Sequence, residues 1–166
     1  MYAIRSDYPQ RSFFKRIYLK LLKIIIQHFP SNSFRIKALR LSGFSVGSHV
    51  YIGQDLIVAS PISEKSCNLI IGNRVAIGPR VTIVLSSDAN WSKLMENREY
   101  IKSTIELGDD CWIGANVVLL PGVKIGTMSI IGAGAVVTKD IPDYSIAYGV
   151  PARVMGTVID EKRKTI

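Results

Sequence analysis

A six-residue period runs through most of this 166-residue chain. Aliphatic residues lead hexads in three unbroken runs, which start at residue 46 (VGSHVY, IGQDLI, VASPIS), residue 71 (IGNRVA, IGPRVT, IVLSSD) and residue 107 (LGDDCW and five more). Chance spacing of Ile and Gly in an ordinary sheet protein does not account for twelve hexads that hold one phase around only two gaps. Repetition at a fixed period indicates a solenoid and outweighs local propensity as a sign of fold.

Each hexad has the features of one short strand followed by a corner. The leading aliphatic residue is expected to point inward, and the Gly or small residue after it is expected to permit the turn. The fifth position is small or β-branched: Val50, Val75, Val81, Cys111, Val117, Val123, Ser129 and Ala135. Three such strands close a triangular coil of eighteen residues, and stacked coils bury a continuous apolar prism. The predicted fold class is therefore mainly β, a parallel β-helix.

Two gaps interrupt the repeat. The first, PISEKSCNL from residue 61, is short and predicts a bulge or a small loop at a corner. The second covers residues 86–100 and carries polar and charged side chains with no inward-facing repeat. Loops that leave a rigid scaffold are where function concentrates, so we expect this loop to belong to the functional site.

The N-terminal segment, residues 1–43, is predicted to be helical and basic. Apolar residues recur at three- and four-residue steps over residues 11–28 with basic residues between them, which is typical of an amphipathic helix. A second, short helix is expected over residues 34–41, before Gly43. Residues 1–40 hold nine Lys or Arg against one acidic residue, whereas the remainder of the chain is neutral.

Two interpretations of this basic helix stay open. It either caps the end of the prism, which every solenoid requires, or lies through residues 11–28 on an anionic membrane surface. Nucleic acid is not an expected partner, because the aliphatic helix offers little aromatic or polar chemistry for reading bases. The rest of the chain divides into the β-helix domain, residues 44–157, and a C-terminal tail, residues 158–166.

Cysteine content and hydropathy bear on the compartment. Cys67 and Cys111 are too few and too far apart for a disulfide framework or a CxxC metal site, which favours a reducing compartment. No apolar stretch approaches the roughly 20 residues that span a bilayer, because Lys23 interrupts the longest one. We expect a cytoplasmic protein, with a peripheral position at the inner face of the membrane as the alternative.

The segment GDDCWIGANVVLLPGVKIGTMSIIGAGAVVTKDIPDYSIAYGVPARV resembles the C-terminal signature of the hexapeptide-repeat acyltransferases, and most closely the sugar O-acetyltransferases of the maltose, galactoside and polysaccharide types. The resemblance covers roughly residues 40–157. It implies a left-handed β-helix, a homotrimer, and acetyl-CoA bound in the groove between adjacent prisms as the acyl donor. It also implies a saccharide acceptor of the polysaccharide, lipopolysaccharide or capsule type.

The resemblance assigns five residues to the cofactor. Ala115 and Ala133 match positions that contact the pantetheine arm through their backbone. Thr138 and Lys139 match positions near the far end of the cofactor, and Arg153 matches a basic residue that meets the cofactor's phosphates. The spacing agrees, because Ala115 and Ala133 are eighteen residues apart and therefore stack in successive coils, where small side chains leave a smooth strip. An arginine facing phosphate forms a charge-assisted hydrogen bond.

Three further residues are candidates for the acceptor side of the site. Trp112 lies beside the cleft in the resembling family, and Asn90 in the loop is assigned to the substrate pocket. The family places a histidine in this loop, where a neutral imidazole can take the proton of a sugar hydroxyl. Here that position is Asp88, and the only histidines are His28 and His49.

An aspartate has an ordinary pKa of ~3.9 and is a poor base at neutral pH unless burial raises that pKa. Asp88 therefore serves as a base with a raised pKa or orients an amine, or His49 comes from a neighbouring subunit, or the site binds without efficient catalysis. The corresponding functions are an acetyl-CoA-dependent O-acetyltransferase and a non-catalytic CoA-binding scaffold. A zinc enzyme resembling the gamma-class carbonic anhydrases needs three histidine ligands, so no metal is expected.

Overall fold

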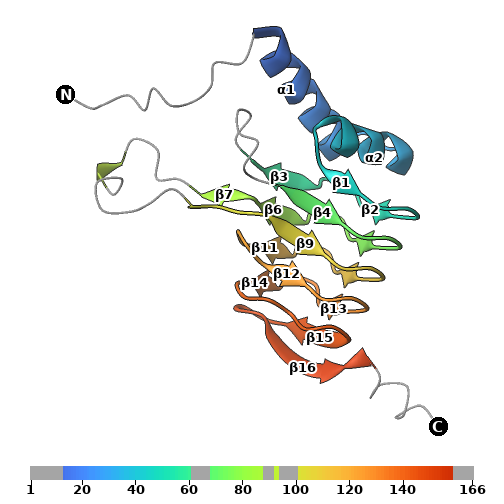
Figure 1. The fold of residues 1–166 in the computed structure, drawn as a ribbon, viewed down its shortest axis with the longest axis vertical. Coiled ribbons are helices and arrows are strands. Elements are labelled where there is room, and N and C mark those ends of the chain that lie inside the picture. The colour runs from blue at the N-terminus through green and yellow to red at the C-terminus, as the bar shows by residue number, and fades with distance from the viewer. Residues whose placement is uncertain (1–12, 61–67, 88–91, 94–100, 159–166) are drawn as a thin grey trace.

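Three parallel sheets form the faces of a prism, and each complete coil takes one strand from every sheet (Figure 1). The computed structural model describes residues 13–60, 68–87, 92–93 and 101–158. Face A contains β1 (Ser45–Val46), β4 (Leu69–Ile71), β9 (Ile105–Leu107) and β12 (Lys124–Ile125). Face B contains β2 (Tyr51–Ile52), β5 (Ala76–Ile77), β10 (Trp112–Ile113), β13 (Ile130–Ile131), β15 (Ser145–Tyr148) and β16 (Arg153–Thr157). Face C contains β3 (Ile57–Ala59), β6 (Thr82–Val84), β11 (Val118–Leu119) and β14 (Val136–Val137).

The predicted hexad phase is confirmed by burial and by strand register. Trp112 pairs with Ile130, and Val118 pairs with Val136, in each case eighteen residues along the chain. Eleven of the twelve leading aliphatic residues are buried, and the exception, Val46, is partly buried in the first coil. The eight fifth-position residues named above are also buried, so each of their hexads contributes two side chains to the core.

The expected reason for the second-position glycines was wrong. Their φ angles are ordinary, and a left-handed φ falls instead on the fourth position of most hexads, as at Asp110 (60°) and Asn116 (57°). Asn and Asp tolerate this conformation better than other non-glycine residues. The second position needs glycine because the next coil is too close: a Cβ on Gly114 would lie 2.6 Å from the backbone nitrogen of Ala133.

The corners are named here by the faces that they join. Corner AB comprises residues 47–50, 72–75, 108–111 and 126–129, corner BC comprises residues 53–56, 78–81, 114–117 and 132–135, and corner CA includes residues 120–123 and 138–140.

Two helices cover the N-terminal end of the prism (Figure 1). They are α1 (Phe13–His28) and α2 (Asn32–Leu41), close to the predicted helices. The buried guanidinium of Arg35 donates to the Ile52 carbonyl on the edge of face B, from Nη2 at 2.7 Å, and Arg40 donates from Nη2 to the Val46 carbonyl of face A at 3.0 Å. An open sheet edge would otherwise be available for pairing with other chains. These contacts confirm the capping interpretation for α2 and for the buried face of α1.

The C-terminal end closes with a hairpin. After β14 the last coil is two residues shorter, since Ile130 pairs with Ile146 sixteen residues later. The chain then reverses, and β16 runs antiparallel to β15 at the edge of face B. Within the described residues, the prism thus ends at this side in its own strand.

Candidate active site

The second gap is a loop that leaves the prism at corner CA. Thr82 on β6 pairs with Val118 on β11, 36 residues away, so the loop adds the length of one coil. It begins and ends as an antiparallel pair, β7 (Ser86–Ser87) and β8 (Ile101–Lys102), and β7 extends away from the prism body (Figure 1). Asp88 follows Ser87 directly, but Asp88 and Asn90 lie outside the described residues.

Ala115 and Ala133 stack at corner BC, as their spacing predicted. The Gly134 amide donates to the Ala115 carbonyl at 2.8 Å, which holds the two coils in register. Ala115 is half-buried and Ala133 is exposed, so the corner presents methyl groups and backbone. This surface is a narrow strip on which a thin, amide-bearing chain can lie without meeting a large side chain.

Arg153 extends the same strip toward the C-terminal end. It pairs with Tyr148 across the β15 and β16 hairpin, and the turn between them bonds to face C, since the Ala152 amide donates to the Val136 carbonyl at 2.8 Å. Its exposed guanidinium donates from Nη1 to the Ala152 carbonyl at 2.9 Å. A cation therefore stands at one end of the strip of small residues, where a phosphate would complement it.

Thr138 and Lys139 do not join this strip within one chain. They follow β14 and lie at corner CA, the corner from which the loop leaves, and both side chains are exposed. Face C separates them from Ala133, and its outward side chains Val118 and Val136 are half-buried and apolar. The five cofactor candidates are thus divided between the two edges of face C.

Trp112 lies on face B, just before corner BC. Its side chain is 59% exposed, and its register neighbours are the small Ala76 on β5 and Ile130 on β13. A large aromatic surface that stays exposed beside a small residue is available to a ligand or a second subunit. The strip and Trp112 are therefore adjacent features of one edge of the prism.

Neither histidine lies at the loop corner. His49 is an exposed residue at corner AB of the first coil, with the left-handed φ of a fourth position (56°). His28 ends α1, with its Nδ1 3.5 Å from a carboxylate oxygen of Asp55. Within the described part of the chain, corner CA carries no imidazole.

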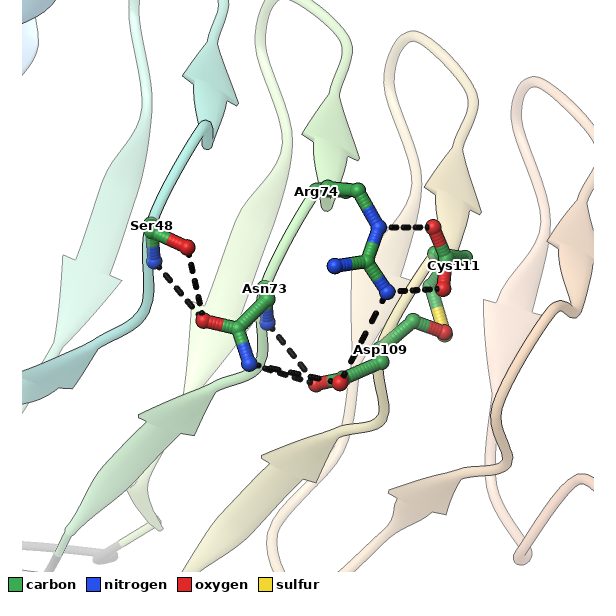
Figure 2. A network of polar contacts seen from close by, with 6 residues as sticks. Ser48, Asn73, Arg74, Asp109 and Cys111 are labelled. Carbon is green, nitrogen blue, oxygen red and sulfur yellow. Dashed lines mark hydrogen bonds and ion pairs between the residues drawn. The ribbon is translucent and has the colours of Figure 1, made fainter.

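Corner AB is cross-linked by polar side chains (Figure 2). The Ser48 amide donates to Asn73 Oδ1 at 2.9 Å, and the Asn73 amide donates to Asp109 Oδ1 at 2.8 Å. This backbone hydrogen bond is the main cause that lowers the pKa of Asp109. Beside it Arg74 forms a bidentate pair with Asp110, at 2.6 and 2.7 Å, which lowers the pKa of the Asp110 carboxyl.

The Cys111 thiol also belongs to corner AB but points inward. It donates to the Gly126 carbonyl at 2.9 Å, and burial raises its pKa, so the thiol is inert toward a substrate. Among the residues that the structure describes, no group of three or more His, Cys, Asp or Glu side chains could hold a metal ion. The chemistry of corner AB is accordingly that of a structural contact between coils.

Comparison with known proteins supports one family. The bacterial transferase hexapeptide (six repeats) model matches residues 104–139. The galactoside O-acetyltransferase of Lactococcus lactis is 32% identical over 89% of this chain and 70% of its own length, and that of Escherichia coli K12 is 38% identical over 72% of this chain and 60% of its own. A Vibrio cholerae hexapeptide-repeat acetyltransferase, solved with acetyl coenzyme A, superimposes with a TM-score of 0.65 at 25% identity over 87% of each chain.

The chain belongs to the bacterial hexapeptide transferases. This membership confirms the predicted fold class, a left-handed β-helix with N-terminal helices and an extruded loop, and identifies the chain as a member of an acetyltransferase family. The chain spans less than two thirds of the length of the Escherichia coli relative.

The sequence interpretation missed two residues at corner BC, the edge of this hexapeptide transferase on which Ala115 lies. Arg80 and Asn116 occupy fourth positions in successive coils at corner BC, where Arg80 Nε donates to Asn116 Oδ1 at 2.9 Å. The sequence spacing could have revealed them. When one coil length is subtracted for the loop, Pro79 takes the same position in its coil as Ala115 in the next. Corner BC therefore continues above Ala115 as a polar, exposed edge.

Proposed function

We propose that this hexapeptide transferase moves an acetyl group from acetyl-CoA to a hydroxyl group of a saccharide. The observation that carries the proposal is the strip of small residues at corner BC, Ala115 and Ala133, which ends at the exposed guanidinium of Arg153. The strip fits a pantetheine arm, whose amides would meet exposed backbone, and Arg153 would meet its phosphates. The acetyltransferase relatives, one of them solved with acetyl coenzyme A, support the same donor.

We propose a homotrimer as the working form. In one chain, corner BC carries the strip, while corner CA carries the loop root, Thr138 and Lys139, and face C lies between them. A rotation that sets corner CA of one copy against corner BC of the next would unite the two halves, and a head-to-tail contact of this kind forms a three-membered ring when the rotation is a third of a turn. Each cleft would then contain Trp112 and Arg153 from one chain and the loop from its neighbour.

In that cleft the loop carboxylate Asp88 would act on the acceptor. Acetyl-CoA supplies a thioester whose C–S bond would break as the new ester C–O bond forms, and CoA would leave as a thiolate that takes up a proton to become the free thiol. Asp88 would accept the proton that the attacking hydroxyl loses, Asn90 would hold the acceptor, and Trp112 would form one wall of its pocket. The acceptor is proposed to be a saccharide of the polysaccharide, lipopolysaccharide or capsule type, and the reducing compartment is proposed to be the cytoplasm.

The direct test measures acetyl transfer to a panel of saccharides, corrected for hydrolysis of acetyl-CoA. Wild type is expected to acetylate at least one of them, and Asp88→Ala is expected to lose transfer while keeping the thermal shift that CoA produces. If the wild-type chain transfers nothing and Asp88→His gains activity, the native protein is a CoA-binding scaffold and the proposed reaction is wrong.

A further inference from the structure

The first helix presents two different apolar faces. Its smaller face packs on the prism, where Leu22 and Ile26 are buried and Leu19 is partly buried. Its larger face is exposed to solvent and consists of apolar residues spaced three or four apart along the helix. This exposed stripe comprises Phe13, Phe14, Ile17, Tyr18, Leu21 and Ile24. Four of these six residues are more than half exposed, with Phe13 at 71% and Phe14 at 80%.

Capping does not require this larger face. The prism end is closed by the underside of α1 and by α2, through Arg35, Arg40 and Lys23, whose ammonium donates to the Ser60 carbonyl at 2.8 Å. Figure 1 shows α1 rising away from the first coil toward its N-terminal end. A contiguous apolar surface of this kind is uncommon on a soluble protein unless it binds something.

The charges beside the stripe indicate what it binds. Arg16 and Lys20 lie one turn apart along one border of the stripe, Lys15 lies beyond the other border, and all three are exposed. The two helices together hold seven Lys or Arg and no acidic residue. An apolar stripe bordered by cations is complementary to a bilayer surface that contains anionic lipids.

We infer that α1 lies on a membrane surface rich in anionic phospholipids, with Phe13, Ile17 and Leu21 in the acyl boundary and Arg16 and Lys20 among the headgroups. A second copy of this chain is the less favourable occupant, because it would bring two cationic borders together and neither described helix carries a carboxylate to place between them. This position is peripheral, since neither described helix is long and apolar enough to cross a bilayer. The inference does not depend on the proposed reaction.

The experiment is flotation of the full chain with vesicles of phosphatidylcholine, with and without phosphatidylglycerol. Wild type is expected to float only with the anionic vesicles, and added salt should weaken the binding. Leu21→Ser should lower the partition coefficient at least about tenfold. The matched control is Leu41→Ser on α2, because Leu21 and Leu41 are equally exposed, at 53% and 52%.

A second pair of variants tests the charge. Lys20→Gln should weaken binding about fivefold, whereas Lys124→Gln, which removes an exposed lysine from face A of the prism, should leave it unchanged. Transfer to a soluble saccharide should be the same in all four variants. Absence of flotation with anionic vesicles, or equal losses in Leu21→Ser and Leu41→Ser, would overturn the inference. The inference would also be overturned if wild type did not float and Leu21→Ser had a lower molecular mass in solution than wild type. The stripe would then join two copies of the chain.

Discussion

Corner AB and corner BC occupy equivalent positions of the hexad but differ in chemistry. At corner AB the third positions of the first three coils are Ser48, Asn73 and Asp109, and their side chains hydrogen-bond from coil to coil. At corner BC the third positions of the last two coils are Ala115 and Ala133, which offer methyl groups and backbone. A solenoid can therefore use one corner to hold its coils together and leave another open for a ligand.

Both corners need glycine at the second position, and this requirement gives the largest expected effect. Gly114→Ala at corner BC should destabilise the fold by about 3 kcal/mol, because the new Cβ meets the backbone of Ala133. Gly108→Ala at corner AB should do the same, since its Cβ would lie 2.7 Å from the Thr127 nitrogen. Chemical unfolding measures both. A stable Gly114→Ala variant would mean that the coils can separate at corner BC.

The third position should separate the two corners. Ala133→Leu places a bulky side chain on the strip and should weaken CoA binding roughly 30-fold, or about 2 kcal/mol, with little change in melting temperature because Ala133 is exposed. Gln54→Leu is the matched control, as it changes an exposed third position of corner BC two coils above Ala115. Calorimetric titration with CoA is the measurement. Equal affinities for Ala133→Leu and wild type would remove the strip from the cofactor site.

The charge at the end of the strip should have a smaller effect. Arg153→Ala is expected to weaken CoA binding about tenfold, because an exposed charge-assisted hydrogen bond to phosphate is partly screened by water. The loss should be smaller for a pantetheine fragment that lacks the nucleotide phosphates. An equal loss for the fragment and for CoA would place Arg153 away from the phosphates.

The smallest expected effect is on the pH dependence of stability, which should differ between variants of the arginines at the two corners. The pKa of Asp110 is lowered in the folded chain by its hydrogen bonds with Arg74. This pair therefore stabilises the fold fully above the ordinary carboxylate pKa of ~3.9, and the stabilisation is lost as the pH falls through the lower pKa of the folded chain.

Arg74→Gln should therefore be less stable than wild type at pH 7 and approach it as the pH falls through that range. At corner BC, Arg80 bonds to Asn116, which does not titrate. Any effect of Arg80→Gln on stability should therefore be the same at neutral and acidic pH. Thermal unfolding from pH 7 to pH 3 checks the pair. Parallel curves for wild type and Arg74→Gln would contradict the assignment.

The sequence was sufficient for the fold because its signal is a period. Core positions such as Ile113 and Val117 repeat in phase, so burial followed from counting along the chain. The reason for glycine at residue 114 could not be predicted from the sequence. A close approach between coils and a left-handed turn both favour glycine, and only the φ angles distinguish the two.

The candidate site was only partly predictable for a related reason. The stacking of Ala115 and Ala133 follows from an eighteen-residue spacing, whereas the separation of Lys139 from them depends on which corner each hexad occupies. Burial of α1 was also uncertain, since an apolar stripe such as the one containing Leu21 has the same pattern whether it faces the prism or solvent.

Corner BC is proposed to be the binding edge of the prism, and corner AB its structural edge. A crystal structure of the chain with CoA tests it most directly. The pantetheine arm is expected to lie along Ala115 and Ala133, with the phosphates at Arg153 and the sulfur facing the loop of a neighbouring copy. An arm that lies along Ser48, Asn73 and Asp109, or no bound CoA at all, would contradict it.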